Sequence, residues 1–204
     1  MTRLACLDGP ATATLSDRLV DVYRAAMGVP PFHETEVETG WFAQELADEL
    51  TEPGFRCWVA SDNDGQVAGF AYGFPTPEIP ADGWYGSLRE AVGPGAAEQW
   101  LTGQFAVVWI AVNPERRGRG LGRSLLERLV AGAGTERAWL VTHDLDTPAQ
   151  ALYRSLGFRE LGRGALGWHD AERVVLGVDL PQGGLHRDPP LSDPPVGEAT
   201  SPAE

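Results

Sequence analysis

Residues 115–124 read ERRGRGLGRS, which places four arginines and three glycines in ten positions of a chain with a formal net charge of -13. Glycines let a backbone approach an anion without interference from Cβ atoms, and the amides that open a helix can donate hydrogen bonds to it. The guanidinium groups add a positive local field. A solvated basic loop is the alternative interpretation. The residue types and their spacing favour a site that binds phosphate.

Two familiar phosphate-binding motifs do not fit this stretch. The P-loop requires a lysine, and all 16 basic residues of this chain are arginines. The dinucleotide fingerprint requires GxGxxG, whereas residues 118–122 read GRGLG. The flanking sequence nevertheless predicts a strand, a turn and a helix, because an apolar run over 105–112 precedes the stretch and leucines at helical spacing follow it over 121–134.

The hexapeptide RGRGLG at 117–122 resembles the RxxGxG signature of the GNAT N-acetyltransferases, which bind the pyrophosphate of acetyl-CoA. The longer segment VNPERRGRGLGRSLLERL is similar to the family's strand, V-x-P bend, turn and helix in that order. DTPAQALYRSLGF resembles the family's N-x-x-A-x-x-LY-x-x-LGF segment. The resemblance covers residues 105–160 closely. It implies an α/β GNAT fold, with a mixed central sheet of splayed parallel strands flanked by helices.

The resemblance also implies which residues contact acetyl-CoA, the expected co-substrate. The turn would hold the pyrophosphate, and the pantetheine arm would pair with a strand edge between the splayed strands 105–112 and 137–143. An amide of this region would face the thioester oxygen as an oxyanion donor. The expected cofactor-binding residues are Ile110, Ala111, Val112, Arg117, Gly118, Arg119, Gly120, Leu121, Gly122, Arg123, Ser124, Asp146, Ala149 and Tyr153.

Tyr153 stands where the family places its general acid, which would protonate the departing thiolate. A free tyrosine has a pKa of about 10 and a thiol one of about 8.5, so proton donation is uphill unless the geometry assists it. A tyrosine that only packs within its helix is the alternative. Asp146 stands where the family often has an asparagine that contacts the cofactor. Because an ionised carboxylate accepts hydrogen bonds but does not donate them, capping the next helix is an alternative role for Asp146.

The family often carries its general base as a glutamate on the strand before the signature, but 105–112 contains none. The candidates that remain are His33, Glu34 and Glu36 in the loop PPFHETE, and His143 at the end of its strand. A solvated or capping role competes with catalysis for each of them. Water as the base, or an acceptor amine of low pKa, are further alternatives. We expect Glu34 and His143 to be catalytic together with Tyr153.

A Pro- and Gly-rich insertion over 75–103 interrupts the regular pattern and has room for one short helix around 84–92. Connections of this length are often lids or binding loops. In the family this connection lies on the acceptor side of the sheet. We therefore expect Trp84 and Tyr85, with His33, to contact the acceptor substrate. Core packing or a dimer contact is the alternative.

The 204 residues predict one GNAT acetyltransferase domain over 1–180 and a disordered, Pro-rich acidic tail over 181–204. Apolar periodicity, caps and turn residues predict the other elements. They are a strand over 2–7, helices over 11–28 and 38–50, a hairpin around 64–65, a helix from 147 to 157 and a last strand over 172–180.

Composition narrows the class of function. Strong acidity argues against nucleic-acid binding, and the chain has neither an apolar run of membrane-spanning length nor a signal peptide, so we expect a cytoplasmic protein. Cys6 and Cys57 form no metal-ligand pattern, and no metal is expected. The sequence predicts an acetyl-CoA-dependent N-acetyltransferase that acts on a small-molecule amine by direct attack in a ternary complex. A longer acyl donor, an alcohol acceptor, a non-catalytic CoA-binding regulatory module and a homodimer stay open.

Overall fold

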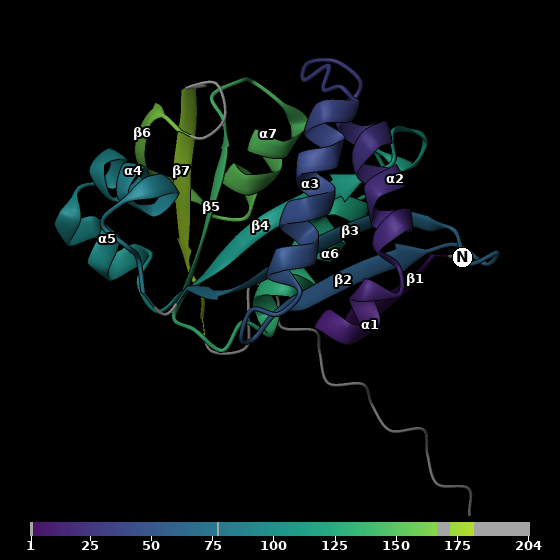
Figure 1. Cartoon of the computed structure of the whole chain (residues 1–204), viewed down its shortest axis with the longest axis horizontal. Coiled ribbons are helices and arrows are strands. Elements are labelled where there is room, and N and C mark those ends of the chain that lie inside the picture. Colours follow the sequence, from purple (N-terminus) through teal and green to yellow (C-terminus); the bar gives the residue numbers. More distant parts are fainter. Residues whose placement is uncertain (1, 77, 167–171, 182–204) are drawn as a thin grey trace, which may run out of the picture.

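The computed structural model describes residues 2–76, 78–166 and 172–181, and these contain seven strands of one mixed sheet. The strands are β1 (Arg3–Leu7), β2 (Arg56–Ser61), β3 (Val67–Thr76), β4 (Gln104–Val112), β5 (Arg137–His143), β6 (Arg159–Ala165) and β7 (Glu172–Asp179). Their spatial order is β1-β2-β3-β4-β5-β7-β6 (Figure 1). Strands β4 and β5 are parallel neighbours, and the other neighbouring pairs are antiparallel.

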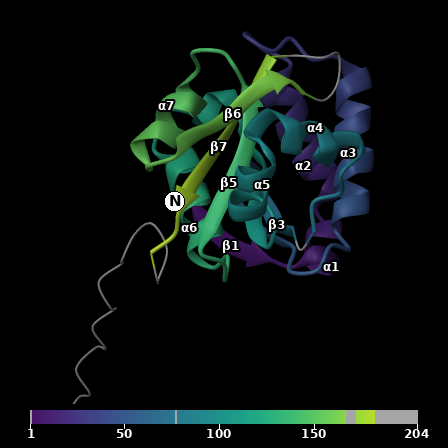
Figure 2. The same cartoon turned by 90° about the vertical axis from the view of Figure 1, so that its left-hand side faces the viewer.

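Helices cover both faces of this sheet. They are α1 (Gly9–Ala13), α2 (Ser16–Met27), α3 (Glu36–Glu49), α4 (Gly83–Val92), α5 (Pro94–Trp100), α6 (Leu121–Ala131) and α7 (Pro148–Ser155), with a short 3-10 turn η1 (Pro114–Arg116). Figure 2 shows α6 and α7 on one side of the sheet and α2 to α5 on the other. Helices α2 and α3 pack over β2 to β4, and α4 and α5 pack over β5 to β7.

Alternation along the strands divides the core between the two faces. Phe70, Tyr72 and Phe74 of β3 pack against α2 and α3, whereas Ala71 packs against α6. The insertion supplies a third cluster of its own, in which Leu88 of α4 is fully buried. The insertion is therefore a packed part of the core as well as a connection.

The two parallel strands separate soon after they begin. Strands β4 and β5 pair only at Phe105↔Ala138 and Ala106↔Trp139. Beyond that point β4 stays paired with β3 as far as Val112, and β5 stays paired with β7 as far as His143. The sheet therefore opens toward the carboxyl ends of β4 and β5, which confirms the predicted GNAT arrangement of splayed strands.

Three elements differ from the sequence prediction. The helix predicted over 11–28 is divided, because the backbone leaves the helical region at Leu15 between α1 and α2. The insertion contains two helices rather than one, separated by Gly93 at φ 84. Strand β6 was not predicted, since it is a largely exposed edge strand without clear apolar alternation. Of the tail predicted over 181–204, residues 182–204 lie outside the described residues.

Candidate active site

The glycine-rich turn joins the end of β4 to the start of α6. Gly118 and Gly120 have φ of 74 and 75, a backbone region that residues with a Cβ rarely adopt. Within the described structure a Cβ built on either glycine would meet no atom within 4 Å. Gly120 is the N-cap of α6, and no described side chain caps that helix end. The first amides of α6 thus stay available to an anion.

Three of the four arginines around the turn bind the protein itself. Their partners are Asp62 for Arg116, the carbonyl oxygens of Val112 and Ala26 for Arg117, and Ser155 with Glu127 for Arg123. Arg119 is exposed and makes no hydrogen bond or ion pair with any described residue. The positive field expected from four arginines is therefore partly compensated, and Arg119 is the guanidinium left free for an anion.

The strand edge beside the turn fits an extended ligand arm. Ile110, Ala111 and Val112 lie beyond the last residue pair that joins β4 to β5, so no described strand covers their β5 side. The Val112 carbonyl accepts a hydrogen bond from Arg117 Nε at 3.2 Å. An unpaired strand edge that ends at an anion-binding turn fits a pantetheine arm followed by a pyrophosphate.

Tyr153 lies in α7 on the same face of the sheet as α6. Its ring is 5% exposed and lies 5.9 Å from the ring of Phe158, centroid to centroid. Burial raises the pKa of Tyr153 above its usual value, so the hydroxyl stays protonated. That hydroxyl has no hydrogen-bond partner among the described residues.

The other expected contacts of this face come from the starts of α6 and α7. Leu121, Gly122 and Ser124 are half-buried in the first turn of α6. Ala149 is half-buried in α7 and packs on the core, while Asp146 is exposed just before the helix. Thr147, and not Asp146, is the N-cap of α7, because its side chain accepts a hydrogen bond from the amide of Gln150 at 3.3 Å.

Seven ionisable side chains gather on the opposite face of the sheet, around the splay. We call this group the splay cluster: Tyr23, Glu34, Glu45, Glu49, Tyr72, His143 and Arg173. Tyr23 donates a hydrogen bond to Glu34, and Tyr72 donates one to Glu49 at 2.7 Å. Glu45 accepts a hydrogen bond from the indole of Trp109 on β4 at 3.2 Å.

Arg173 and His143 form the β5–β7 side of the cluster. They lie directly opposite each other in the strand register, which places their side chains next to one another on one face. Arg173 interacts electrostatically with Glu34 and Glu45. Its Nε is the one buried side-chain polar atom without a hydrogen-bond partner among the described residues.

Burial sets the protonation of this cluster. Loss of solvent raises the pKa of Glu49 to about 8, although the hydrogen bond from Tyr72 opposes the shift. Burial also raises the pKa of Glu34 and of Glu45. Burial and then the charge of Arg173 lower the pKa of His143, so this imidazole is neutral at pH 7 and can accept a proton.

Two of the four candidate bases belong to the splay cluster, and the other two are exposed. Glu34 and His143 belong to the splay cluster, and the ring of Phe32 lies 5.2 Å from that of His143. His33 is exposed with φ 54 in the loop that follows α2. Glu36 is exposed in an ion pair with Arg24. Of the loop residues, Glu34 alone is held against a cluster side chain by a hydrogen bond among the described residues.

Helix α4 carries two of the three expected acceptor residues, Trp84 and Tyr85. Trp84 is 39% exposed, and Tyr85 is half-buried. Burial and then the charges of Glu49, Glu52 and Glu45 raise the pKa of Tyr85.

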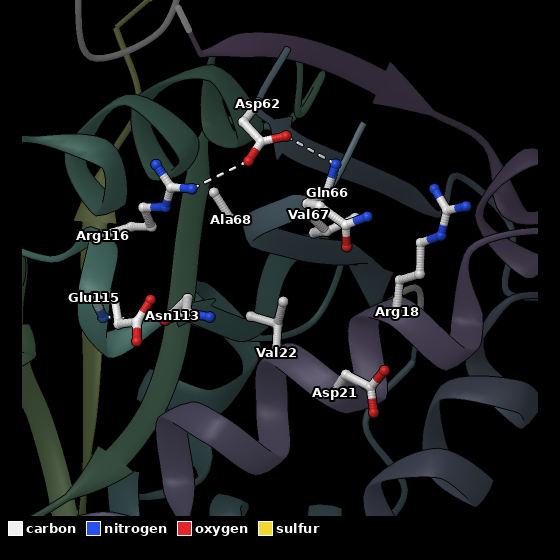
Figure 3. Close-up of a pocket in the computed structure, with 10 residues that line it drawn as sticks. All are labelled: Arg18, Asp21, Val22, Asp62, Gln66, Val67, Ala68, Asn113, Glu115 and Arg116. Atoms are coloured by element: carbon white, nitrogen blue, oxygen red, sulfur yellow. Dashed lines mark hydrogen bonds and ion pairs between the residues drawn. The ribbon is translucent and has the colours of Figure 1, made fainter. Parts of the chain in front are cut away.

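A hollow of about 210 Å³ lies away from these groups, between α2, the β2–β3 hairpin and η1 (Figure 3). Asp62 lies at one edge of it, with one carboxylate oxygen 3.1 Å from Arg116 Nη2 and the other accepting the amide of Gln66 at 3.0 Å. The hollow contains none of the expected site residues. Its contribution to the site is to hold Arg116 at the base of the glycine turn.

Sequence reasoning missed Glu45, Glu49 and Arg173. The two glutamates stand four residues apart and therefore share one face of α3, which is a signal present in the sequence. That signal selects a site only once α3 is known to lie beside the splay. Arg173 gave no signal of its own at the edge of an apolar strand.

The comparisons with known proteins agree with this geometry. A family model described as Acetyltransferase (GNAT) family matches residues 17–158. The chain belongs to the GNAT acetyltransferase family.

Among relatives, the chain is 31% identical over 146 residues to a GCN5-like protein acetyltransferase of Mycobacterium tuberculosis, across 67% of this chain and 68% of the relative. It is 32% identical over 154 residues to the mycothiol acetyltransferase of Nocardia farcinica, across 75% of this chain but 39% of the relative. The crystal structure of the ribosomal-protein-S18-alanine N-acetyltransferase from Escherichia coli has a TM-score of 0.56 at 21% identity, over 88% of this chain and 94% of that one. At that identity the likeness is one of fold.

Within the described ranges no group of three His, Cys, Asp or Glu side chains is placed to hold a metal ion. No helix of those ranges is long and apolar enough to cross a membrane.

Proposed function

We propose that the protein transfers the acetyl group of acetyl-CoA to the amine of a small cationic molecule by direct attack in a ternary complex. The observation that carries this proposal is the opening between β4 and β5, with Tyr153 on one face and the splay cluster on the other. A donor held at the glycine turn would reach the opening along β4. An acceptor would approach from the side of α2 to α5.

The donor is held by the backbone of residues 117–124 and by Arg119. Amides at the start of α6 and the free guanidinium supply hydrogen-bond donors and charge for the pyrophosphate. The backbone of Ile110 to Val112 supplies the edge for the pantetheine arm, and an amide there polarises the thioester carbonyl.

The acceptor is held by charge. Glu34 and Glu45 belong to the splay cluster, and their carboxylates attract a protonated amine when they are ionised. Glu49, whose pKa is about 8, is mostly neutral at pH 7 and offers a hydrogen bond in place of a charge. Trp84 and Tyr85 of α4 add aromatic faces, whose attraction for a cation is worth roughly 0.5–2 kcal/mol. A small molecule is proposed because Tyr85 of α4 interacts electrostatically with Glu45 and Glu49, which indicates that the insertion borders the acceptor side.

Each proton in the reaction has an assigned place. The bound ammonium first loses one proton to solvent and becomes a neutral amine. The amine nitrogen then forms its bond to the acetyl carbon as the carbon–sulfur bond breaks, and His143, neutral at the end of β5, takes the second proton from that nitrogen. The loop after α2 carries Glu34, which accepts a hydrogen bond from Tyr23, and Phe32, whose ring lies against His143. The thiolate that leaves takes a proton from Tyr153 on the opposite face, and solvent returns a proton to Tyr153 after turnover.

A thiol-release assay tests this function with purified protein, acetyl-CoA and a panel of polyamines, aminoglycosides, amino acids and peptides. Small cationic amines should release thiol faster than the panel's neutral amines, and propionyl-CoA should serve less well than acetyl-CoA. Turnover of peptides alone would contradict the small-molecule acceptor. Acetyl-CoA binding by calorimetry without any thiol release would favour a non-catalytic CoA-binding module.

A further inference from the structure

Arg117 directs its side chain back onto the protein, where it binds the end of β4 and the end of α2. Its Nη2 donates to the carbonyl oxygen of Ala26 at 2.9 Å, and its Nε donates to the carbonyl oxygen of Val112 at 3.2 Å. One guanidinium therefore joins the turn and the end of β4 to a helix 91 positions earlier in the chain. This contact uses the fork geometry of arginine, which lysine lacks.

The partner carbonyl belongs to the last turn of α2. The final carbonyls of a helix have no partner within the helix, and a cation at that end also interacts favourably with the helix dipole. Gly28 already donates its amide to Arg24 at 3.0 Å. Arg117 binds the carbonyl of Ala26, two residues beyond that of Arg24, and so supplies a donor to the last turn of α2.

The loop over 28–35 is folded back on that same helix end. The amide of Glu34 donates to the carbonyl of Met27 at 3.0 Å, one residue beyond the carbonyl that Arg117 holds. The Glu34 side chain accepts a hydrogen bond from Tyr23 of α2, and Phe32 lies against His143. A displacement of the end of α2 would therefore move Glu34 and Phe32 relative to the splay cluster.

The other arginines of the turn do not make this connection. Arg116 is paired with Asp62 of the β2–β3 hairpin, and Arg123 is bonded to Ser155 of α7. Arg119 has no partner among the described residues. Among these four side chains, Arg117 is the one that joins the turn to the acceptor side.

We infer that Arg117 is a positioning residue that couples occupation of the glycine turn to the placement of loop 28–35 at the splay cluster. Binding at the turn holds residues 117–124 in one arrangement, and Arg117 carries that restraint to the end of α2. Coupling between two sites is reciprocal, so an ordered loop also favours donor binding. The inference rests on the proposed function only in taking acetyl-CoA as the ligand of the turn.

Amide hydrogen exchange with acetyl-CoA as the probe tests this inference without any acceptor. In the wild type, saturating acetyl-CoA should slow exchange in segment 117–124 and also in segment 28–35, the latter by about fivefold or more. In Arg117→Ala the protection of 117–124 should remain, because Arg116 and Arg123 still hold the turn, and the protection of 28–35 should be lost. Arg117→Lys should behave like Arg117→Ala, since one ammonium cannot hold both carbonyls in the same geometry.

Arg119→Ala is the matched control. It removes the free guanidinium, so acetyl-CoA should bind more weakly, yet at saturation it should protect 28–35 as in the wild type. Equal protection of 28–35 in wild type and in both Arg117 variants would overturn the inference, as would a wild type in which acetyl-CoA protects only the turn. Failure of acetyl-CoA to bind the wild type would instead contradict the proposed function. If Arg117→Ala does not fold, as judged by its thermal melt, Arg117→Lys alone carries the comparison.

Discussion

Burial decides which side chain of the site holds a proton at neutral pH. Tyr153 keeps its proton in a dry environment, and His143 lacks a second proton beside Arg173. Glu49 is largely protonated below pH 8. In the proposed function Tyr153 donates a proton and His143 accepts one on opposite faces of one opening. The two pKa shifts fix the resting protonation states but make each transfer harder, so the proposal relies on the geometry of the bound substrates to assist both transfers.

Tyr153→Phe tests the donor. The change removes one oxygen atom and keeps the packing against Phe158. If Tyr153 protonates the thiolate, kcat should fall by about 10²- to 10⁴-fold, the usual contribution of a general acid. Calorimetry should give a Kd for acetyl-CoA close to that of the wild type.

The control for this variant is Tyr85→Phe, which removes a hydroxyl from the acceptor side. It should alter the acceptor KM more than kcat. A kcat of Tyr153→Phe equal to that of the wild type would reduce Tyr153 to a packing residue.

Glu49 makes stability depend on pH. Its pKa is about 8 in the folded protein against an ordinary value of 4.5. Between these values the folded state binds more protons than the unfolded state, so the free energy of unfolding should fall as pH rises from about 5 to 8. Glu34 and Glu45 act in the same direction, because burial raises their pKa values too.

Glu49→Gln should therefore reduce this fall without abolishing it. As the pH rises from 5 to 8, the free energy of unfolding of the variant should increase relative to that of the wild type. Urea unfolding at pH 5, 6.5 and 8 measures the three free energies for each protein. Glu52→Gln removes an exposed carboxylate just beyond α3 and should keep the wild-type slope. Identical slopes in Glu49→Gln and the wild type would show that Glu49 is not desolvated.

At the scale of elements, the sequence predicts local units well. It predicts poorly which elements distant in the chain come into contact. The β4–turn–α6 unit can be predicted from the sequence because its apolar periodicity, its glycines and its helix start lie within 30 consecutive positions. Glu45 and Glu49 were missed because their helix reads as an ordinary amphipathic element. Their relevance depends on β4 and β5 separating beneath them, and that separation depends on pairings between distant strands.

Edge strand β6 was also missed because its structure depends on contact with another strand. Its residues are mostly exposed, so hydrophobic alternation gives no signal, and only pairing with β7 makes it a strand. Helix α5 was missed for a different reason. It begins at Pro94 with Gly93 as its N-cap, and a Gly-Pro pair marks a break in the chain as readily as a helix start.

Helix α4 has two roles that substitutions can separate. Trp84 is 39% exposed in the first turn of α4, whereas Leu88 is fully buried in the insertion's own cluster. Trp84→Ala should raise the acceptor KM or change the preferred acceptor, with acetyl-CoA affinity and thermal stability close to those of the wild type. Leu88→Ala, the matched core change in the same helix, should cost about 2–5 kcal/mol of unfolding free energy.

Steady-state kinetics and urea unfolding of both variants make the comparison. Equal loss of stability, acetyl-CoA affinity and acceptor affinity in Trp84→Ala would mean that this end of α4 only covers the core. The insertion would then have no separate part in acceptor binding.

At the scale of the whole molecule, the splay divides the sheet into two halves. One half contains β1 to β4, and the other contains β5 to β7. They are joined by two residue pairs at the start of β4 and β5 and by the core under α6 and α7. A ligand lying between β4 and β5 would contact both halves and bind the folded protein far better than the unfolded one.

Acetyl-CoA should therefore raise the free energy of unfolding of the whole chain. At a free concentration of 100 times Kd the expected gain is about 2.7 kcal/mol, measured by thermal or urea unfolding. Gly120→Asp should remove this gain, because a carboxylate at the start of α6 repels the pyrophosphate and its Cβ occupies the approach to the amides. Gly134→Asp is the matched control, since Gly134 has φ 73 and equal open space but lies beyond the far end of α6. Both variants should lose a similar small amount of stability without ligand, because both force a side chain into the left-handed region. If acetyl-CoA stabilises Gly120→Asp as strongly as Gly134→Asp, the ligand binds elsewhere, and the glycine turn is not the pyrophosphate site.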